Sequence, residues 1–144
     1  MADSGLIDDR NCFACGSQNV QGLGLTFEYG EGAVRCSYVA DARFGGWAGM
    51  LHGGIVATML DEAMAHAAIS SGVHAVTGRL EVRFRKPAPT GAPLILEGSV
   101  VRRHGRALDI AATLRSEGGA LYALGNGRFI AEPPTDKGAH PSRG

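Results

Sequence analysis

Apolar and polar positions divide the chain into two groups of strands separated by one helix. The first group has two alternating runs, residues 23–29 and 33–39, and the turn Gly30-Glu31-Gly32 between them predicts a hairpin. The second group has four runs with glycine and proline breakers between them, at residues 80–85, 94–102, 107–114 and 121–130. Strict alternation in residues 80–85 predicts a strand with one buried face and one polar face.

A helical pattern fills residues 53–71 between these two groups. Apolar residues recur there at spacings of three and four, and alanines fill most other positions. A helix that is apolar on nearly every side is typically buried, and Gly72 suits its C-terminal cap. The order of elements therefore predicts an α+β fold, with an antiparallel sheet of about six strands wrapped around one long central helix.

Composition and charge exclude several classes of protein. A chain of 144 residues forms one domain, and 44% hydrophobic residues are too many for a disordered chain. Fourteen basic residues balance fourteen acidic ones, which argues against a nucleic-acid partner. No apolar run reaches the roughly 18 residues of a membrane span, so no membrane partner is expected.

The two ends of the chain differ from the region between them. Residues 1–11 are polar and residues 133–144 are rich in proline and glycine, so we expect flexible tails around a domain of residues 12–132. Residues 1–10 lack the apolar core of a signal peptide. Three cysteines do not suit a secreted disulfide framework, and a cytoplasmic location is the expectation.

The start of the helix, His52-Gly53-Gly54, is the first candidate for chemistry. The first amides of a helix have no intrahelical partner and attract negative charge, and glycines let a ligand approach the backbone. Such a donor stabilises a carbonyl oxygen that is becoming an oxyanion. A tight turn from loop to helix is an alternative explanation of the same glycines.

Asp61 is the second candidate, because it lies among apolar neighbours on a helix that we expect to be buried. A buried carboxylate is costly unless it is hydrogen-bonded or functional, and partial burial raises its pKa toward that of a useful general base. A hydrogen-bonded structural carboxylate is the alternative. His52 and Asp61 are nine residues apart, about 13 Å along a helix. A site that uses both requires two chains, which predicts a two-fold dimer with composite sites.

Basic residues gather in one part of the chain, since residues 79–106 hold seven of them against two acidic residues. Arginine matches the geometry of phosphate groups. Arg83, Arg85 and Lys86 are therefore predicted to contact a phosphate-bearing ligand, and a solvated strand face is the alternative.

The pair Cys12-x-x-Cys15 is compatible with a zinc site or a redox pair. Cys36 is the only other thiol, so a closed four-ligand zinc site needs a histidine such as His52 or His104. A packed turn near the N-terminus is the simpler account, and we expect no metal.

The segment His52-Gly-Gly-Ile-Val-Ala-Thr-Met-Leu-Asp61-Glu-Ala63 resembles the motif of hotdog-fold acyl-CoA thioesterases of the phenylacetate-degradation and THEM type. The segment Arg83-Phe-Arg-Lys-Pro-Ala-Pro-Thr-Gly91 is similar to the next strand and turn of that family. Cys12-Phe-Ala-Cys-Gly16 recurs in a subset of its members. The resemblance covers about residues 12–132.

The resemblance implies a hotdog fold and the hydrolysis of acyl-CoA thioesters to a carboxylic acid and CoA, with no cofactor beyond the CoA of the substrate. Asp61 would be the general base or the nucleophile, and the N–H of Gly53 would polarise the carbonyl from the other protomer. His52 would shape the loop, and Thr77 would hold the attacking water or the Asp61 carboxylate. The expected assembly is a homodimer, which can pair further into a homotetramer.

One position departs from the family pattern. Many relatives carry Asn or Gln six residues before the histidine, where this chain has Gly46. A general-base mechanism, a nucleophilic mechanism and a non-catalytic acyl-CoA binding module therefore all stay open. Substrate-pocket residues are expected around this loop and the helix start, and ordinary core packing is the alternative for its large side chains; the candidates are Gly46, Trp47, Met50 and Gly54, together with Phe44.

Overall fold

The computed structural model describes residues 5–133; residues 1–4 and 134–144, which carry parts of both predicted tails, lie outside the described residues. The elements in chain order are β1 (Glu28–Tyr29), β2 (Ala33–Val39), the short 3-10 helix η1 (Ala42–Phe44), α1 (Gly53–Ser70), β3 (Ala75–Phe84), β4 (Pro93–His104), β5 (Ala107–Ser116) and β6 (Leu121–Ala131). Among the described residues, no helix is long and apolar enough to cross a membrane.

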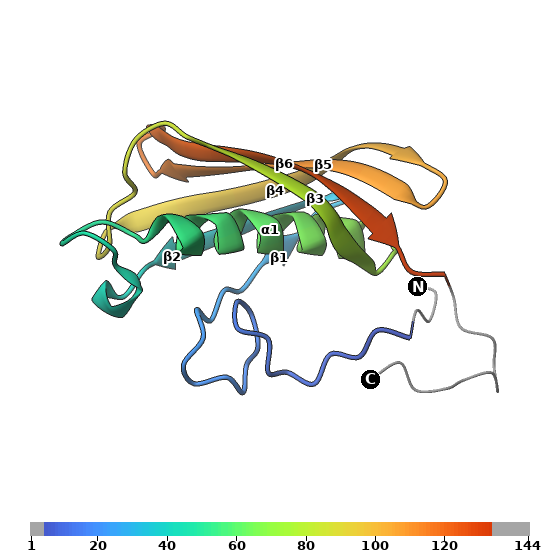
Figure 1. The fold of residues 1–144 in the computed structure, drawn as a ribbon, viewed down its shortest axis with the longest axis horizontal. Helices are drawn as coiled ribbons and strands as arrows, with labels where there is room; N and C mark the ends of the chain where they lie inside the picture. The colour runs from blue at the N-terminus through green and yellow to red at the C-terminus, as the bar shows by residue number, and fades with distance from the viewer. Residues whose placement is uncertain (1–4, 134–144) are drawn as a thin grey trace.

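The strands form one antiparallel sheet in the order β1-β2-β4-β5-β6-β3. Figure 1 shows α1 crossing one face of this sheet, with the N-terminal segment (blue) on the far side of the helix. Because α1 connects β2 to β3, the chain crosses the sheet and places β3 at the edge opposite β1. The α+β fold predicted from the order of elements is confirmed.

The first predicted strand is wrong over most of its length, since only Glu28–Tyr29 pairs with β2. Gly24 has φ +74°, a left-handed conformation that interrupts the extended backbone. The N–H groups of Leu23 and Leu25 instead donate to the carbonyls of Phe13 and Ala14. Residues 23–25 therefore fasten the N-terminal segment rather than extend the sheet.

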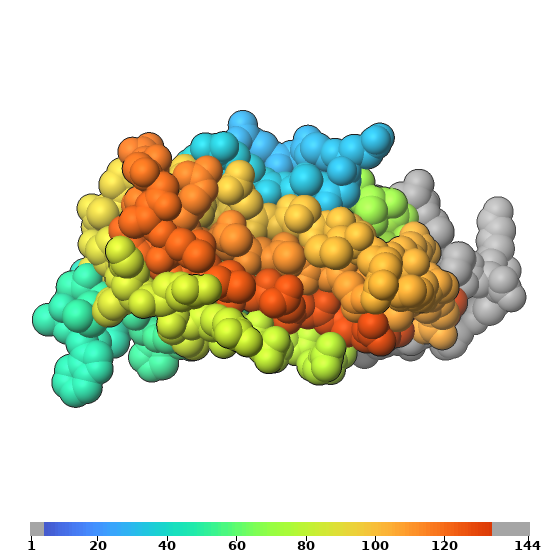
Figure 2. All heavy atoms as spheres, turned by 90° about the horizontal axis from the view of Figure 1, so that it is seen from above, coloured from blue at the N-terminus to red at the C-terminus, as the bar shows by residue number. Residues whose placement is uncertain are grey.

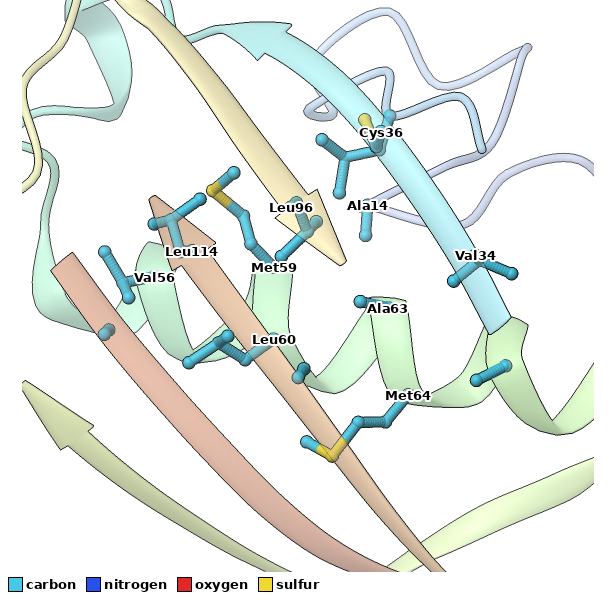
Figure 3. Close-up of a cluster of buried hydrophobic side chains, with 14 of the residues drawn as sticks. Ala14, Val34, Cys36, Val56, Met59, Leu60, Ala63, Met64, Leu96 and Leu114 are labelled. Carbon is cyan, nitrogen blue, oxygen red and sulfur yellow. The ribbon is translucent and has the colours of Figure 1, made fainter. Parts of the chain in front are cut away.

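The core lies between α1 and the sheet. Seven helix residues are buried against the strands, and Figure 3 shows the first five of them with Leu96 and Leu114; the seven are Val56, Met59, Leu60, Ala63, Met64, Ala67 and Ala68. The helix approaches the sheet closely at Gly98 of β4, where a Cβ would lie 2.6 Å from the carbonyl oxygen of Ala63. The absence of a side chain at this position sets the distance between the two layers.

The other side of α1 is only partly covered within one chain. Ile55, Ala65 and Ile69 are half-buried, so the expectation of a helix buried all round is not met by a single chain. The N-terminal segment lies over this side, and a cavity of about 650 Å³ separates Leu6 and Ile7 from the helix. The apolar character of α1 on this side leaves area available for a further contact.

The strand β3 also departs from its predicted burial. The predicted apolar face is present, but Leu80 is 37% exposed and Phe84 is 57% exposed. Figure 2 shows β3 (yellow-green) along one long edge of the sheet. As an edge strand, β3 has a hydrogen-bonded neighbour on one side only. The exposure of Leu80 and Phe84 shows that α1 does not fully cover its apolar face either.

Candidate active site

The helix N-terminus is capped by the side chain of His52. His52 has an extended backbone, and its Nδ1 accepts a hydrogen bond from the N–H of Gly54 at 2.9 Å. The carbonyl of His52 accepts from the N–H groups of Ile55 and Val56. Within residues 5–133, the N–H of Gly53 has no hydrogen-bond acceptor. One donor at the start of α1 is therefore left for a ligand.

Two glycines make room for the His52 ring. A Cβ at Gly54 would lie 3.2 Å from Nδ1 of His52, and a Cβ at Gly46 would lie 3.3 Å from its Cα. The N–H of Gly46 donates to the carbonyl of Met50 at 2.9 Å, which closes the loop before the helix. A larger residue at position 46 would press against His52. The histidine cap of α1 therefore depends on the lack of a side chain at Gly46.

A cavity of about 370 Å³ adjoins the start of α1. Five of the predicted site residues line it, namely Trp47, Met50, Gly53, Arg85 and Lys86. Sequence reasoning missed Phe84 and Tyr122, which also line it. Phe84 is the last apolar residue of the alternating run in β3 and directly precedes Arg85 and Lys86. This position in the sequence could have identified it as a cavity residue.

Other predicted residues lie on the other side of the helix start, and Gly46 lines neither cavity. His52, Gly54 and Phe44 line a second cavity, of about 710 Å³, with Arg43 and Thr58. Phe44 is 7% exposed and belongs to the core. Gly53 and Gly54 therefore open toward different cavities, and only Gly53 combines an unpartnered N–H with the cavity beside Phe84.

Asp61 lies half-buried in the middle of α1. The hydroxyl of Thr77, at the start of β3, donates a hydrogen bond to Oδ1 of Asp61 at 2.6 Å. A β-bulge between Thr77 and Arg79 interrupts the pairing of β3 with β6 directly after this residue. Burial raises the pKa of Asp61 above its ordinary value, the Thr77 hydrogen bond opposes the shift, and the nearby charge of Glu62 adds to it.

Arg83 does not join the other predicted phosphate contacts. Phe84 lies opposite Ala123, which is buried toward the helix, so Arg83 one position earlier faces the outer side of the sheet. The backbone N–H groups of Arg85 and Lys86 both donate to the carbonyl of Tyr122, which fixes this segment beside the cavity. Within residues 5–133, no carboxylate forms an ion pair with these three cations.

The two chemical groups are not brought together within one chain. Gly53 and Asp61 are eight residues apart on the same helix, about 12 Å along its axis. One carbonyl group cannot contact both. The geometry offers an oxyanion donor at one position and a hydrogen-bonded carboxylate at another.

A family model described as the thioesterase superfamily matches residues 48–123, which include Gly53, Asp61, Thr77 and the cavity residues Arg85 and Lys86. The chain belongs to the thioesterase superfamily. The resemblance inferred from the motif around His52 and Asp61 is thereby confirmed.

Relatives and solved structures extend this result to most of the described chain. The acyl-coenzyme A thioesterase THEM4 of Bos taurus is 30% identical over 118 residues, which are 77% of this chain and 48% of that protein. The chain thus spans about half the length of the curated relatives it matches. A crystal structure of another thioesterase superfamily protein has a TM-score of 0.80 and 27% identity, and the match covers 84% of this chain and 60% of that one.

A more distant structure shares the hotdog-like fold. It comes from Streptococcus mutans and is bound to acetyl CoA, with a TM-score of 0.72, 18% identity and coverage of 77% of this chain and 91% of that one. A likeness at this identity concerns the fold alone. These matches establish membership of the superfamily, while the activity of this chain and the roles of its individual residues stay predictions.

Proposed function

We propose that this thioesterase superfamily chain hydrolyses acyl-CoA thioesters, with Asp61 activating the attacking water. One observation carries the proposal: Asp61 is a half-buried carboxylate on an apolar helix, held by the hydroxyl of Thr77. The description of the mammalian relatives as acyl-coenzyme A thioesterases and the acetyl CoA bound to a structural neighbour support the substrate class.

In the proposed reaction, the thioester carbonyl oxygen accepts a hydrogen bond from the N–H of Gly53. Water adds to the carbonyl carbon while Asp61 takes a proton from it. The negative charge that develops on the carbonyl oxygen is stabilised by the helix N-terminus. Collapse of the intermediate breaks the C–S bond, and the CoA sulfur takes up the proton. In the alternative, nucleophilic route, Asp61 attacks the carbonyl carbon itself, CoA leaves, and water hydrolyses the resulting acyl anhydride. This route uses the same two groups, the Asp61 carboxylate and the Gly53 N–H.

The distance between Gly53 and Asp61 makes the proposed site a composite of two chains. The helix start of one chain would face Asp61 of its partner across a two-fold axis, giving two equivalent sites. The uncovered apolar edge of β3 and the half-exposed side of α1 support this arrangement, because both need a contact that one chain does not supply. The homodimer can pair further into a homotetramer.

The cavity beside Gly53 suits the proposed ligand. Its walls combine the aromatic side chains of Trp47 and Phe84 with two cations, Arg85 and Lys86. An acyl or pantetheine chain fits an apolar wall, and CoA carries phosphates that pair with cations at the mouth. Arg83, on the outer face, contributes to this ligand only if a second chain brings a phosphate to that face.

The experiment is a hydrolysis assay over a panel of aryl, short-chain and medium-chain acyl-CoA esters. We expect the wild-type protein to release CoA, and we expect Asp61→Asn and Asp61→Ala to lose about 10²–10⁴-fold in kcat. Undiminished hydrolysis by both variants would remove Asp61 from the mechanism. Tight binding of the esters by the wild type without turnover would select a non-catalytic binding module, for which Gly46 in place of an amide side chain is the supporting observation.

A further inference from the structure

The turn that carries Cys12 and Cys15 has a specific backbone geometry. The sulfur of Cys12 accepts hydrogen bonds from the N–H groups of Ala14 at 3.3 Å and Cys15 at 3.5 Å. The N–H of Gly16 donates to the carbonyl of Cys12 at 2.9 Å, and a Cβ at Gly16 would lie 2.3 Å from the Cys12 nitrogen. Only glycine fits there. Two backbone N–H groups therefore converge on the sulfur of Cys12 and fix its position.

The turn is fixed to the rest of the protein. The carbonyls of Phe13 and Ala14 accept hydrogen bonds from Leu23 and Leu25 at 2.8 and 2.9 Å. Ala14, between the two cysteines, is 3% exposed and points into the core near Cys36 (Figure 3). The positions of both thiols are therefore set by backbone contacts and by packing, before any ligand binds.

The third member of the cluster comes from α1, fifty residues further along the chain. Oε2 of Glu62 lies 3.7 Å from the sulfur of Cys12, and one donor atom each from Cys12, Cys15 and Glu62 lie within 4.8 Å of one another. The side chain of Glu62 is 15% exposed. The Glu62 carboxylate and the two sulfurs therefore form one half-buried cluster of groups that can bind a metal ion.

A set of contacts behind Glu62 holds its carboxylate in place. Nε2 of His66 lies 3.1 Å from Oε2 of Glu62, and the other ring nitrogen is hydrogen-bonded to the hydroxyl of Tyr29. The ring of Phe27 stacks on His66 with the ring centroids 4.4 Å apart. Metal-binding carboxylates are commonly oriented by such a second layer of hydrogen bonds.

We propose that Cys12, Cys15 and Glu62 bind one Zn²⁺ ion, with a fourth coordination position open to the cavity beside the N-terminal segment. Two thiolates and a carboxylate are ligands that zinc accepts, and a tetrahedral site with these bond lengths places its donor atoms about 3.5–3.8 Å apart. Cys12 and Glu62 already have this spacing, and the cavity of about 650 Å³ gives an entry path.

The proposal differs from both alternatives for the cysteine pair. The thiols of Cys12 and Cys15 are free rather than joined, and a redox pair has no need of a carboxylate within 4.8 Å of both sulfurs. A packed turn explains Ala14 and Gly16, and a hydrogen bond from the Cys12 thiol explains the contact with Glu62. Neither explains why the second thiol, Cys15, lies in the same cluster of donor atoms. The bound ion would clip the N-terminal segment onto α1 at the residue after Asp61, and it does not rest on the proposed hydrolysis.

The test is zinc binding by the full, reduced chain after metal removal, measured by competition with a chromophoric chelator. We expect one equivalent to bind, and we expect Co²⁺ in its place to show a thiolate charge-transfer band. Cys12→Ser, Cys15→Ser and Glu62→Gln should each weaken binding at least about 100-fold, and His66→Phe about 10–100-fold. Cys36→Ala, which removes the third thiol outside the cluster, should bind zinc as the wild type does.

Three outcomes would overturn the proposal. They are no stoichiometric uptake by the reduced wild type, zinc binding that survives in the Cys12→Ser/Cys15→Ser double variant, and a Co²⁺ complex without the thiolate band. The first and third outcomes concern the wild-type protein, so the proposal can fail even if a cysteine variant does not fold. Hydrolysis is not measured, so this result and that of the acyl-CoA assay are independent.

Discussion

At the scale of single residues, opposing effects set the pKa of Asp61. Burial raises its pKa, the hydroxyl of Thr77 lowers it, and the charge of Glu62 raises it. With the native pKa above that of the unfolded chain, the native state binds more protons in the pH range between the two values. The free energy of unfolding therefore falls as pH rises through that range and stays lower above it.

Because the charged Asp61 lowers the free energy of unfolding, we predict that Asp61→Asn stabilises the protein at neutral pH while it removes activity. The neutral amide avoids the burial of a charge, and its oxygen can still accept the hydrogen bond from Thr77. Thermal unfolding at pH 7 should give a Tm equal to or above that of the wild type, and the advantage should vanish toward acidic pH. A lower Tm at pH 7 would show that the charged carboxylate stabilises the fold.

Thr77 is predicted to act as a positioning residue for Asp61. Thr77→Val removes the hydrogen bond that lowers the pKa of Asp61, so the acidic limb of the profile of kcat/KM against pH should move to higher pH. Thr77→Ser keeps the hydroxyl and should keep the wild-type profile. Identical profiles for the valine and serine variants would indicate that the hydroxyl has only a structural role.

The sequence identified these candidate residues unevenly. Asp61 was found because a carboxylate on an apolar helix is unusual, and Gly53 because of its position at the helix start. The histidine cap on Gly54 was not predicted, since it depends on the rotamer of His52. The contact of Glu62 with Cys12 was not predicted, because the two residues are fifty positions apart and only the folded chain brings them together.

At the scale of elements, the contact between α1 and β4 depends on the lack of a side chain at Gly98. Gly98→Ala would place a Cβ 2.6 Å from the carbonyl oxygen of Ala63. Chemical denaturation should show a loss of about 1–3 kcal/mol in the free energy of unfolding. Gly118→Ala is the control, because a Cβ there would lie 3.8 Å from Ser116 Oγ, and its change should stay within about 0.5 kcal/mol. Equal free energies of unfolding for Gly98→Ala and the wild type would show that α1 can move away from the sheet without loss of stability.

The helix was predicted to within one residue at its end because its apolar period is long and its start and stop residues are distinct. The strands after it were predicted with ends that differ by a few residues at most, apart from β3, which begins five residues earlier. The run at residues 23–29 failed because the alternation of side chains does not reveal the left-handed backbone of Gly24. Periodicity predicts which side chains lie on the same face of an element, but it does not predict which strand that element pairs with.

At the scale of the whole molecule, the uncovered edge at β3 predicts a self-associating surface. Leu80→Lys places a charge in the middle of that edge, where the native leucine is 37% exposed, and should convert a dimer to a monomer and abolish hydrolysis. Val101→Lys, at a 67% exposed position of β4 away from this edge, should change neither property. Sedimentation measures the change, and a fully active Leu80→Lys monomer would contradict the composite site.

The composition of the site from two chains is tested most directly by mixing two inactive variants. Asp61→Asn lacks the base. Gly53→Pro lacks the N–H donor, and proline suits the first position of a helix; the extended backbone of His52 before it is compatible with proline. Gly53→Ala keeps the donor and is the control, because its Cβ would contact Phe84 at an ordinary 3.7 Å.

The decisive measurement is the acyl-CoA hydrolase activity of the co-expressed Asp61→Asn and Gly53→Pro chains, compared with each variant alone. Each alone should lose about 10²-fold or more in kcat. In the mixture, half of the dimers contain both chains, and each of these keeps one intact site, so activity should recover to about a quarter of the wild-type value. No recovery, in a mixture shown to contain both chains in one dimer, would contradict a site built from Gly53 of one chain and Asp61 of the other.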